Sequence, residues 1–396
     1  MSEQYCIDTY SLSINKKGEE LCGDMVDVIY RPDRSIVVLA DGMGSGVKAN
    51  ILATLTSRII GTMLAGGADI EDCVQTISDT LPVCHERGIA YSTFTIIEVG
   101  DDGNVYTAEF DGPEMVVLRD GILDESLDKR MRVINGKNVW ECHFHAQPQD
   151  MLVTFSDGVI HAGIGQLLNL GWKRENVMEF CQRTYRKNMP ARDMTRALMN
   201  TCYDLYEGEA GDDTTITTVR ILPRTETKVL VGPPADMKDD RKVVDILRSA
   251  SGKKIVCGGS TSHLVARELG VPLRGDTNYY SDDVPPIAFI EGIDLTTEGV
   301  LTLTAAETLL EKYLNEVKTG QKPDGYIDLD KKDGATRLVR TLMDETSNIT
   351  FMLGQANNPA YKKGDTRLGL DVKMRIVSSL AEKLTEAGKR VKIEEY

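Results

Sequence analysis

The sequence contains no long hydrophobic run and no segment that resembles a targeting signal. No stretch of the 396 residues approaches the ~20 consecutive apolar residues that a membrane-spanning helix requires. The first ten residues lack the basic and apolar regions of a secretory signal peptide. These absences predict a cytoplasmic protein that has no membrane segment and does not act on a membrane.

Basic residues are in the minority. The chain has 46 lysines and arginines against 61 aspartates and glutamates, which gives a formal net charge of −15. Because nucleic acids and anionic membranes are bound by basic surfaces, neither is expected as the main partner. The acidic residues are spread along the chain, which indicates a solvated surface with some acidic sites.

The sequence also lacks paired cysteines. Its 8 cysteines form no C-x-x-C motif. Scattered thiols in a chain of this length are typical of reduced, mostly buried cysteines in a cytosolic protein. The local run of Cys142, His143 and His145 is not favoured as a metal site, because alternation along a strand separates Cys142 from His143.

The length predicts two domains, since 396 residues exceed one ordinary hydrophobic core. The boundary is expected within residues 223–228, which gives domains 1–225 and 226–396. In the first domain, antiparallel strands with long inserted helices indicate an α+β fold. In the second, strands alternate with helices, which predicts a separate α/β domain with three layers and a Rossmann-like arrangement.

Local patterns predict the individual elements. Strands are expected at 5–13, 23–30, 36–40, 92–99, 105–110, 114–119, 131–139, 151–155, 212–221, 229–231, 254–257, 286–290, 349–353 and 390–393. Helices are expected at 47–65, 69–81, 172–206 with a break near Pro190, 239–251, 258–270, 304–317, 337–343 and 374–387.

Residues 36–50 carry the most informative pattern in the chain. Five apolar residues end at Asp41, glycines follow at positions 42, 44 and 46, and a helical pattern then begins. A buried strand that delivers an aspartate at its tip is a common way to present a metal ligand. Glycine at position 42 lets the backbone approach an ion, with its carbonyl oxygen as a further ligand.

Three further acidic turns of this kind lie in the same domain. They are Gly23-Asp24, Ser156-Asp157-Gly158 and Gly211-Asp212-Asp213. Asp24 and Asp41 lie on strands that are neighbours in the sequence and are expected to pair, so their carboxylates are expected to converge. Carboxylate and water ligands without histidine or cysteine select Mg²⁺ or Mn²⁺, and two such ions can activate a water for attack on phosphorus. The alternative is four solvated turn aspartates, which are individually common.

These motifs, in this order, resemble the metal-dependent serine/threonine protein phosphatases of the PPM type. The subgroup is the bacterial one named after stage II sporulation protein E, and the resemblance covers about residues 6–221. It implies a β-sandwich flanked by helices that holds two Mn²⁺ or Mg²⁺ ions. The helices expected at 47–81 match a regulatory pair of this subgroup.

The resemblance also implies roles for single residues. Asp41 would bridge the two ions, the carbonyl of Gly42 would bind one of them, and Asp24 would lie at or just behind that ion. Asp157 and Asp212 would hold the other ion, with Asp213 in a supporting position. Asp41, Asp157 and Asp212 are therefore the expected catalytic residues, and the expected substrate is phosphoserine or phosphothreonine on a small regulatory protein, such as an anti-anti-sigma-type domain.

Two departures from the family pattern stand out. Many members outside this subgroup have a histidine after Asp-Gly that is proposed as general acid, whereas Met43 cannot donate a proton. No arginine is assured as a phosphate ligand either. Lys16 or Lys17 is a candidate for that role, although solvated turn lysines are the simpler interpretation.

The second domain offers one candidate site. Residues 258–262 follow an expected strand and open a helix, so free backbone N–H groups and the hydroxyls of Ser260 and Thr261 could bind a small anion. The pattern is neither a dinucleotide fingerprint nor a P-loop. Capping and tight packing are the alternative. A ligand-sensing or regulatory role for residues 226–396 is a hypothesis that follows from this candidate.

Three functions remain open at this point. The leading hypothesis is a phosphoprotein phosphatase in bacterial signalling. A second is a non-catalytic phosphatase-like module that binds a partner or small ligand, and a third is a two-metal phosphohydrolase that acts on a small molecule. A homodimer is also considered. Intact aspartates at all four turns favour an enzyme, because a protein without turnover has no need for a repulsive carboxylate cluster.

Overall fold

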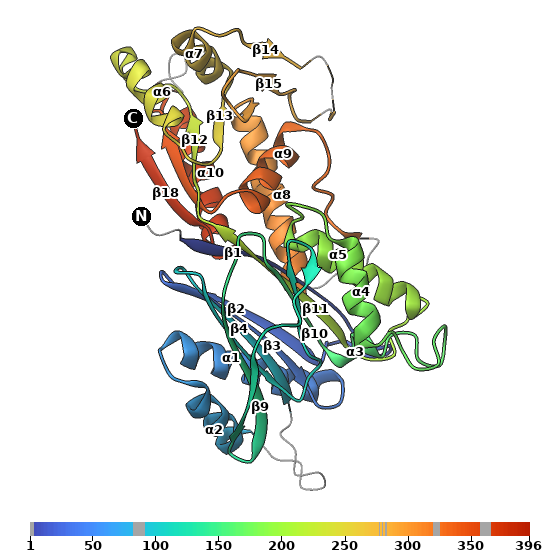
Figure 1. Cartoon of the computed structure of the whole chain (residues 1–396). Coiled ribbons are helices and arrows are strands. Elements are labelled where there is room, and N and C mark those ends of the chain that lie inside the picture. The colour runs from blue at the N-terminus through green and yellow to red at the C-terminus, as the bar shows by residue number, and fades with distance from the viewer. Residues whose placement is uncertain are drawn as a thin grey trace. The chain divides into compact units, whose positions relative to one another are not determined.

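The computed structural model describes residues 4–81, 92–276, 278, 280–281, 283–319, 325–356 and 366–396 (Figure 1). The chain divides into two compact units. Unit 1 comprises Met1–Pro223 and Thr319–Tyr326, and unit 2 comprises Arg224–Lys318 and Ile327–Tyr396. Within the described residues, every helix is too short or too polar to cross a membrane.

Unit 1 contains two antiparallel sheets. The first has the order β1-β11-β10-β6-β7 and the second the order β2-β3-β4-β5-β9-β8. The strands of the first sheet are β1 (Tyr5–Ile14), β11 (Thr214–Pro223), β10 (Met151–Phe155), β6 (Val116–Arg119) and β7 (Ile122–Leu123). Those of the second are β2 (Asp24–Tyr30), β3 (Arg34–Gly42), β4 (Ser92–Gly100), β5 (Asn104–Phe110), β9 (Lys137–His145) and β8 (Lys129–Ile134).

Helices accompany both sheets (Figure 1). Beside the second sheet lie α1 (Gly46–Ala65) and α2 (Ile70–Thr80), and beside the first lie α4 (Arg174–Thr184) and α5 (Ala191–Leu205); a short helix, α3 (Asp157–Ile160), follows β10. The helix α2 begins as expected, because the Asp69 side chain accepts a hydrogen bond from the Asp72 N–H. The mixed α+β architecture predicted for this part of the chain is confirmed.

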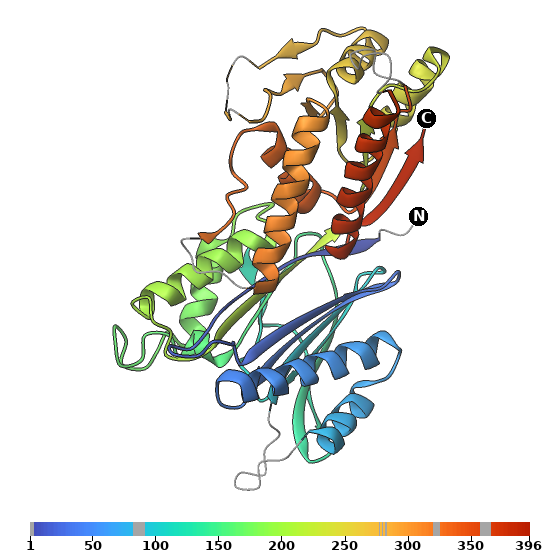
Figure 2. The same ribbon diagram turned by 180° about the vertical axis from the view of Figure 1, so that it is seen from behind.

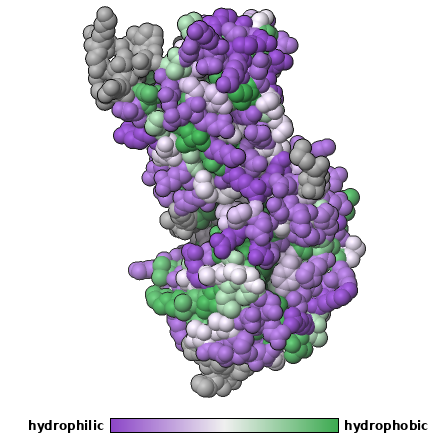
Figure 3. Space-filling view, turned by 90° about the vertical axis from the view of Figure 1, so that its left-hand side faces the viewer, coloured by the Kyte–Doolittle hydropathy of each residue, from purple (hydrophilic) through white to green (hydrophobic). Residues whose placement is uncertain are grey.

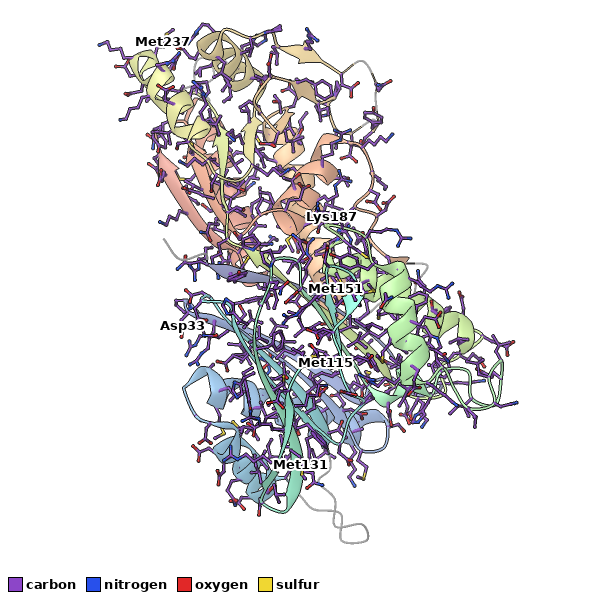
Figure 4. The ribbon with its side chains drawn as sticks, in the orientation of Figure 1. Asp33, Met115, Met131, Met151, Lys187 and Met237 are labelled. Carbon is purple, nitrogen blue, oxygen red and sulfur yellow. The ribbon has the colours of Figure 1, made fainter. Side chains whose placement is uncertain are left out.

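Side-chain alternation along β3 divides the core of unit 1 between two layers. Ile36 and Val38 pack in a cluster with residues of α1 and α2, whereas Val37 packs with residues of the first sheet such as Leu152 and Val219. A strand buried on both faces has few polar positions, which explains the uninterrupted apolar run that ends at Asp41. Figure 4 places Met115 and Met151, both buried, in the interior, whereas Met131 and Met237 lie near the outside.

Some sequence predictions in unit 1 were wrong in detail. The single strand expected at 131–139 is a hairpin formed by β8 and β9, with Asn135 and Gly136 at positive φ in its turn. The strand expected from 212 begins at Thr214, so Asp212 and Asp213 precede β11 rather than belong to it. Gly42, which was expected in a turn, is still paired with Ser92 at the end of β3.

The segment Thr319–Tyr326 belongs to unit 1 although it lies far along the chain. Its described part includes Tyr326, whose ring lies 4.8 Å from the guanidinium carbon of Arg196 on α5. A guanidinium over an aromatic face at this distance makes a cation–π contact. The compact unit therefore includes chain from beyond residue 225.

Unit 2 contains one sheet of the order β14-β15-β16-β13-β12-β17-β18. The five strands from β16 to β18 are parallel, and β14 and β15 extend the sheet in antiparallel fashion. The strands are β12 (Glu226–Val231), β13 (Lys254–Cys257), β14 (Arg274–Gly275), β15 (Ala288–Phe289), β16 (Leu295–Thr297), β17 (Asn348–Leu353) and β18 (Arg390–Glu395).

Helices cover both faces of this sheet. On one face, α6 (Asp240–Arg248) and α7 (Gly259–Leu269) share a core cluster with Leu230, Val256 and Met352. On the other face lie α8 (Val300–Thr319) and α10 (Thr366–Glu386), which Figure 2 shows in front of the strands. A short helix, η1 (Met237–Asp239), precedes α6, and α9 (Gly334–Asp344) precedes β17. The Rossmann-like description of this unit stays a prediction.

The predicted helices of unit 2 are present, but α8 begins at Val300 rather than at 304, and α10 at Thr366 rather than at 374. The strand expected at 286–290 is reduced to two residues in β15. The short strand β16, which was not predicted, supplies an edge on which β15 pairs. Hydrophilic residues prevail on the face of the molecule seen in Figure 3, in keeping with the acidic composition.

Candidate active site

Asp24 and Asp41 lie directly opposite each other at the ends of β2 and β3. The pairing follows from the hairpin that joins the two strands, whose register places each residue of β2 opposite one of β3. The Gly42 N–H donates a hydrogen bond of 3.0 Å to the Gly23 carbonyl, which fixes the two strand ends together. The structure therefore brings together two carboxylates that the sequence predicted to converge.

The protein environment favours the protonated forms of both carboxyl groups when no cation is present. Burial raises the pKa of Asp24, and the carboxylates of Asp213 and Asp157 raise it further. Burial is also the main cause that raises the pKa of Asp41, followed by the negative charges of Asp24 and Asp157. Such mutual repulsion is relieved by a cation bound between the groups.

Hydroxyl groups surround one side of the Asp24 carboxyl group. Hydrogen bonds from Ser156 and Thr215 act against the rise of its pKa. These residues are fixed in turn, since the Ser156 hydroxyl accepts a bond of 2.9 Å from the Thr215 N–H. No role was predicted for Ser156, because only the pairing of β10 with β11 shows what its hydroxyl contacts.

Asp157 is presented by the turn from β10 into α3. The Tyr206 hydroxyl holds the backbone of this turn in place by donating a hydrogen bond of 2.7 Å to the Gly158 carbonyl. A Cβ on Gly158 would lie 2.2 Å from the Asp213 carbonyl oxygen, so the turn packs against the segment before β11. Burial and the charge of Asp212 raise the pKa of Asp157. His161 Nδ1 lies 3.8 Å from the Asp157 carboxylate.

Asp212 and Asp213 differ in their surroundings. Asp213 is buried, and its Oδ1 accepts a hydrogen bond of 2.9 Å from the Lys16 N–H. Asp212 is more exposed, and its Oδ1 lies 3.3 Å from the Lys16 ammonium group. Lys16, one of two candidate phosphate ligands, thus lies at the carboxylate cluster, whereas the ammonium of Lys17 pairs with Glu209.

Gly42 occupies a position where no side chain fits. A Cβ at this residue would lie 2.1 Å from the Ala49 carbonyl oxygen and 2.9 Å from the Gly23 carbonyl oxygen. The first turns of α1 therefore pack directly onto the end of β3, as close approach through glycine allows. Binding of a metal ion by the Gly42 carbonyl stays a prediction.

The donor set fits hard divalent cations, although it is not a complete ligand shell. Buried oxygens without a hydrogen-bond partner include Asp24 Oδ2 and Asp213 Oδ2. Within the described ranges, no three histidine, cysteine, aspartate or glutamate side chains form a ready-made metal-binding group. Mg²⁺ retains several waters and binds through one or two carboxylates, so paired aspartates with unused oxygens suit it.

Glu19 is a further residue that the sequence analysis missed. Its carboxylate accepts a hydrogen bond of 2.9 Å from the Ser45 hydroxyl, just before α1. A Cβ on Gly46 would lie 2.3 Å from the same carboxylate. Glu19 thus ties the loop between β1 and β2 to the turn after Asp41, a contact between distant segments that no local pattern indicates.

The candidate anion site of unit 2 is only partly open. Ser260 is exposed at the start of α7, whereas Thr261 is fully buried with an unpartnered hydroxyl. The carboxylate of Glu298 lies 3.2 Å from the place a Cβ on Gly259 would take, and it brings negative charge to this helix start. Anion binding at Ser260 and Thr261 stays a prediction.

A family model described as Stage II sporulation protein E (SpoIIE) matches residues 31–222. Residues 31–222 form a SpoIIE-type domain. The matched segment runs from the turn before β3 almost to the end of β11, and it includes Asp41, Asp157 and Asp212. The family resemblance predicted from the motifs is therefore confirmed.

Known relatives of the SpoIIE-type domain are distant. Stage II sporulation protein E of Bacillus subtilis (strain 168) is 21% identical over 249 residues, which cover 61% of this chain and 29% of that protein. The crystal structure of the phosphatase domain of SpoIIE from Bacillus subtilis shares 17% identity at a TM-score of 0.44, covering 56% of this chain and 95% of that one. A structure of RsbX in complex with magnesium shares 14% identity at a TM-score of 0.39, covering 54% and 95%.

Proposed function

We propose that unit 1 is a metal-dependent serine/threonine protein phosphatase. The observation that carries this proposal is the juxtaposition of Asp24 and Asp41, two carboxyl groups whose pKa values are raised by burial and by their neighbours. Family membership of residues 31–222 supports the same activity. A buried carboxylate beside a half-buried one destabilises the fold when no cation is present, so the pair of Asp24 and Asp41 supports cation binding.

Mn²⁺ or Mg²⁺ would be held by the side chains of Asp24, Asp41, Asp157 and Asp212, with the Gly42 carbonyl as a further ligand. Two bound divalent cations would supply Lewis-acid catalysis and an activated water for attack on phosphorus. The chain itself contributes the placement of the ligands. Ser156, Thr215 and Tyr206 hold the Asp24 carboxyl group and the Asp157 turn in position.

Lys16 is proposed as the residue that binds the phosphate group. Its ammonium is half exposed and lies 3.3 Å from Asp212 Oδ1, so it is within reach of a ligand at the cluster. Its backbone N–H is fixed by Asp213, which limits the motion of the loop that carries it. An ammonium group is a common phosphate ligand in proteins.

The leaving serine or threonine oxygen must receive a proton, and the side chain of Met43 cannot donate one. His161 is a titratable side chain at the cluster. It lies beside the Asp157 carboxylate and is half exposed. We therefore include His161 among the candidates for proton donation to the leaving serine or threonine oxygen.

The proposed substrate is a phosphoserine or phosphothreonine on a small regulatory protein, such as an anti-anti-sigma-type domain. This follows from the family resemblance of unit 1. A phosphorylated side chain on a folded partner would reach the cluster from the side of Asp157, Asp212 and Lys16, whose side chains are partly exposed.

The test is phosphate release from a phosphoserine peptide by the full chain, with Mn²⁺ and with chelator. Turnover that requires Mn²⁺ and is abolished by Asp41→Asn is expected, whereas Asp120→Asn, an exposed turn aspartate, should retain activity. A non-catalytic binding module would bind Mn²⁺ without turnover in any form. Faster release from a small phosphate ester than from every phosphoprotein offered would favour a small-molecule phosphohydrolase.

A further inference from the structure

In the parallel sheet of unit 2, the chain adds strands first on one side of β12 and later on the other, so the strand order reverses between β12 and β17. From β12 the chain runs through α6 to β13 and then to β16, whereas β17 and β18 lie on the other side of β12. The helices that follow these two strands lie on opposite faces, α6 on one and α10 on the other (Figure 2). In open α/β sheets, ligands bind outside the carboxyl ends of the strands at such a point.

Two glycines lie at the carboxyl ends of these strands. Gly232 follows β12 with φ of 87°, and Gly354 follows β17. A Cβ on Gly354 would lie 2.1 Å from the Pro233 carbonyl oxygen, so the two loops are in direct contact. A Cβ on Gly232 would lie 2.8 Å from the Lys373 Nζ. The missing side chain at Gly232 thus leaves room for an ammonium group.

Lys373 reaches this place from α10. Its Nζ donates a hydrogen bond of 3.2 Å to the Gly354 carbonyl, which is its one hydrogen-bond partner within the described part of the chain. An ammonium group has three protons to donate. Burial lowers the pKa of Lys373. Within the described residues, the side chain is a half-buried cation that forms no salt bridge.

Polar groups at the end of β18 bond to the loops that follow β12 and β17. The Tyr396 main-chain oxygen accepts hydrogen bonds from the N–H groups of Ala235 and Gln355. The carboxylate of Glu395 accepts from the Gln355 side chain, and that of Glu394 from the Tyr396 hydroxyl. None of these groups is a hydrogen-bond partner of Lys373, whose Nζ bonds to the Gly354 carbonyl within the described residues.

The starts of α6 and α7 are less suitable than the position of Lys373 for binding an anion. The start of α6 carries negative charge from Asp236 and Asp240, although Arg267 offsets part of it by pairing with Asp240. Glu298 brings a carboxylate to the start of α7. Phosphate groups avoid such neighbours, whereas the position of Lys373 has the opposite charge.

We propose that the carboxyl edge of the sheet between β12 and β17 binds a small ligand that bears a phosphate group, and that Lys373 is the charged residue that anchors it. The proposal rests on unit 2 alone and does not depend on the activity proposed for unit 1. It moves the expected anion site of this unit from Ser260 and Thr261 to the neighbourhood of Gly232 and Gly354.

The test is isothermal titration calorimetry of the full chain with inorganic phosphate, AMP and adenosine at constant ionic strength. Excess chelator is present throughout, so that metal-dependent phosphate binding in unit 1 does not contribute. Saturable binding of phosphate and AMP but not of adenosine is expected. Tighter binding of AMP than of phosphate would identify a nucleotide-type ligand, and equal affinity would identify the free oxyanion.

Variants of Lys373 decide whether the binding occurs at the proposed place. Lys373→Met should weaken phosphate binding roughly ten- to hundredfold, the usual effect of losing a hydrogen bond to a charged group. Lys373→Arg keeps the charge and should retain part of the affinity. Lys312→Met, at an exposed lysine of α8, should leave it unchanged. Phosphate should also slow amide exchange within 226–236 and 348–356.

Two results would overturn the proposal. One is the absence of saturable binding of both phosphate-bearing probes to the wild-type chain. The other is wild-type affinity in Lys373→Met. If Lys373→Met fails to fold, the comparison of Lys373→Arg with the wild type and the exchange pattern still decide, because protection confined to other segments places the anion elsewhere.

Discussion

Asp24 and Asp41 are cross-strand partners, and further carboxylates lie beside each of them. The pKa of each carboxyl group is raised first by burial and then by other carboxylates. Ser156 and Thr215 offset this only in part, through hydrogen bonds to Asp24. Unit 1 therefore contains a local electrostatic strain that a divalent cation would remove, and this relationship leads to the first two predictions.

The stability of the metal-free protein should fall as pH rises. The pKa is raised to about 7 for Asp24 and to about 9 for Asp41, against about 4 for a carboxyl group in the unfolded chain. Between these values the folded state binds more protons than the unfolded state, so the free energy of unfolding decreases with increasing pH. Amide hydrogen exchange in β2 and β3 at pH 5 to 9, with chelator, measures this. A pH-independent opening free energy would contradict the prediction, and Mn²⁺ should reduce the slope.

Asp24→Asn should stabilise the metal-free protein at pH 8 and abolish its stabilisation by Mn²⁺. The substitution removes a buried charge whose Oδ2 has no hydrogen-bond partner, and the gain should be about 1–3 kcal/mol. Thermal unfolding with and without Mn²⁺ measures both effects. Asp120→Asn serves as the control, because this exposed aspartate lies in a turn between β6 and β7. A loss of stability in Asp24→Asn under chelator would show that the charge itself supports the fold.

Gly42→Ala should destabilise unit 1 by about 1–3 kcal/mol, the usual range for overpacking. The added methyl group would lie 2.1 Å from the Ala49 carbonyl oxygen, and a helix backbone cannot yield as a side chain does. Gly112→Ala is the matched control, since a Cβ there meets nothing closer than 3.6 Å. Denaturant unfolding of the two variants should separate them clearly. Equal midpoints would mean that α1 shifts easily relative to β3.

Lys16→Met should lower kcat/KM for phosphopeptide hydrolysis roughly tenfold or more, as expected for loss of an electrostatic contact to a reacting phosphate group. Lys17→Met is the control, because the ammonium of Lys17 pairs with Glu209 instead. Both variants should fold normally, since both side chains are partly exposed. Similar activity of Lys16→Met and wild type would assign phosphate binding to another residue.

Much of unit 1 could be predicted because its signals are local. The apolar run before Asp41 predicted a buried strand, and the short hairpin after Tyr30 predicted the partner that carries Asp24. The hairpin of β8 and β9 was missed because the exposed apolar residues Met131 and Val133 resemble a continuous strand, so the turn at Asn135 and Gly136 was overlooked.

Residues whose roles depend on distant pairing could not be found in this way. Ser156 and Thr215 meet only because β10 pairs with β11, and Glu19 meets Ser45 across two loops. Lys373 is the clearest case, because its significance depends on which strands are neighbours in the sheet of unit 2. A lysine in a helix looks solvated until the topology places it over the ends of two strands.

The segment Thr319–Tyr326 affects the order in which unit 1 can be completed during synthesis. Because Tyr326 contacts Arg196 and is counted with unit 1, this unit lacks a part until residue 326 has been synthesised. On the ribosome, the two sheets of unit 1 can form once β11 has emerged, but the segment that ends at Tyr326 arrives only after most of unit 2 has been synthesised. A fragment that stops at residue 225 would therefore be permanently in the state of an unfinished nascent chain.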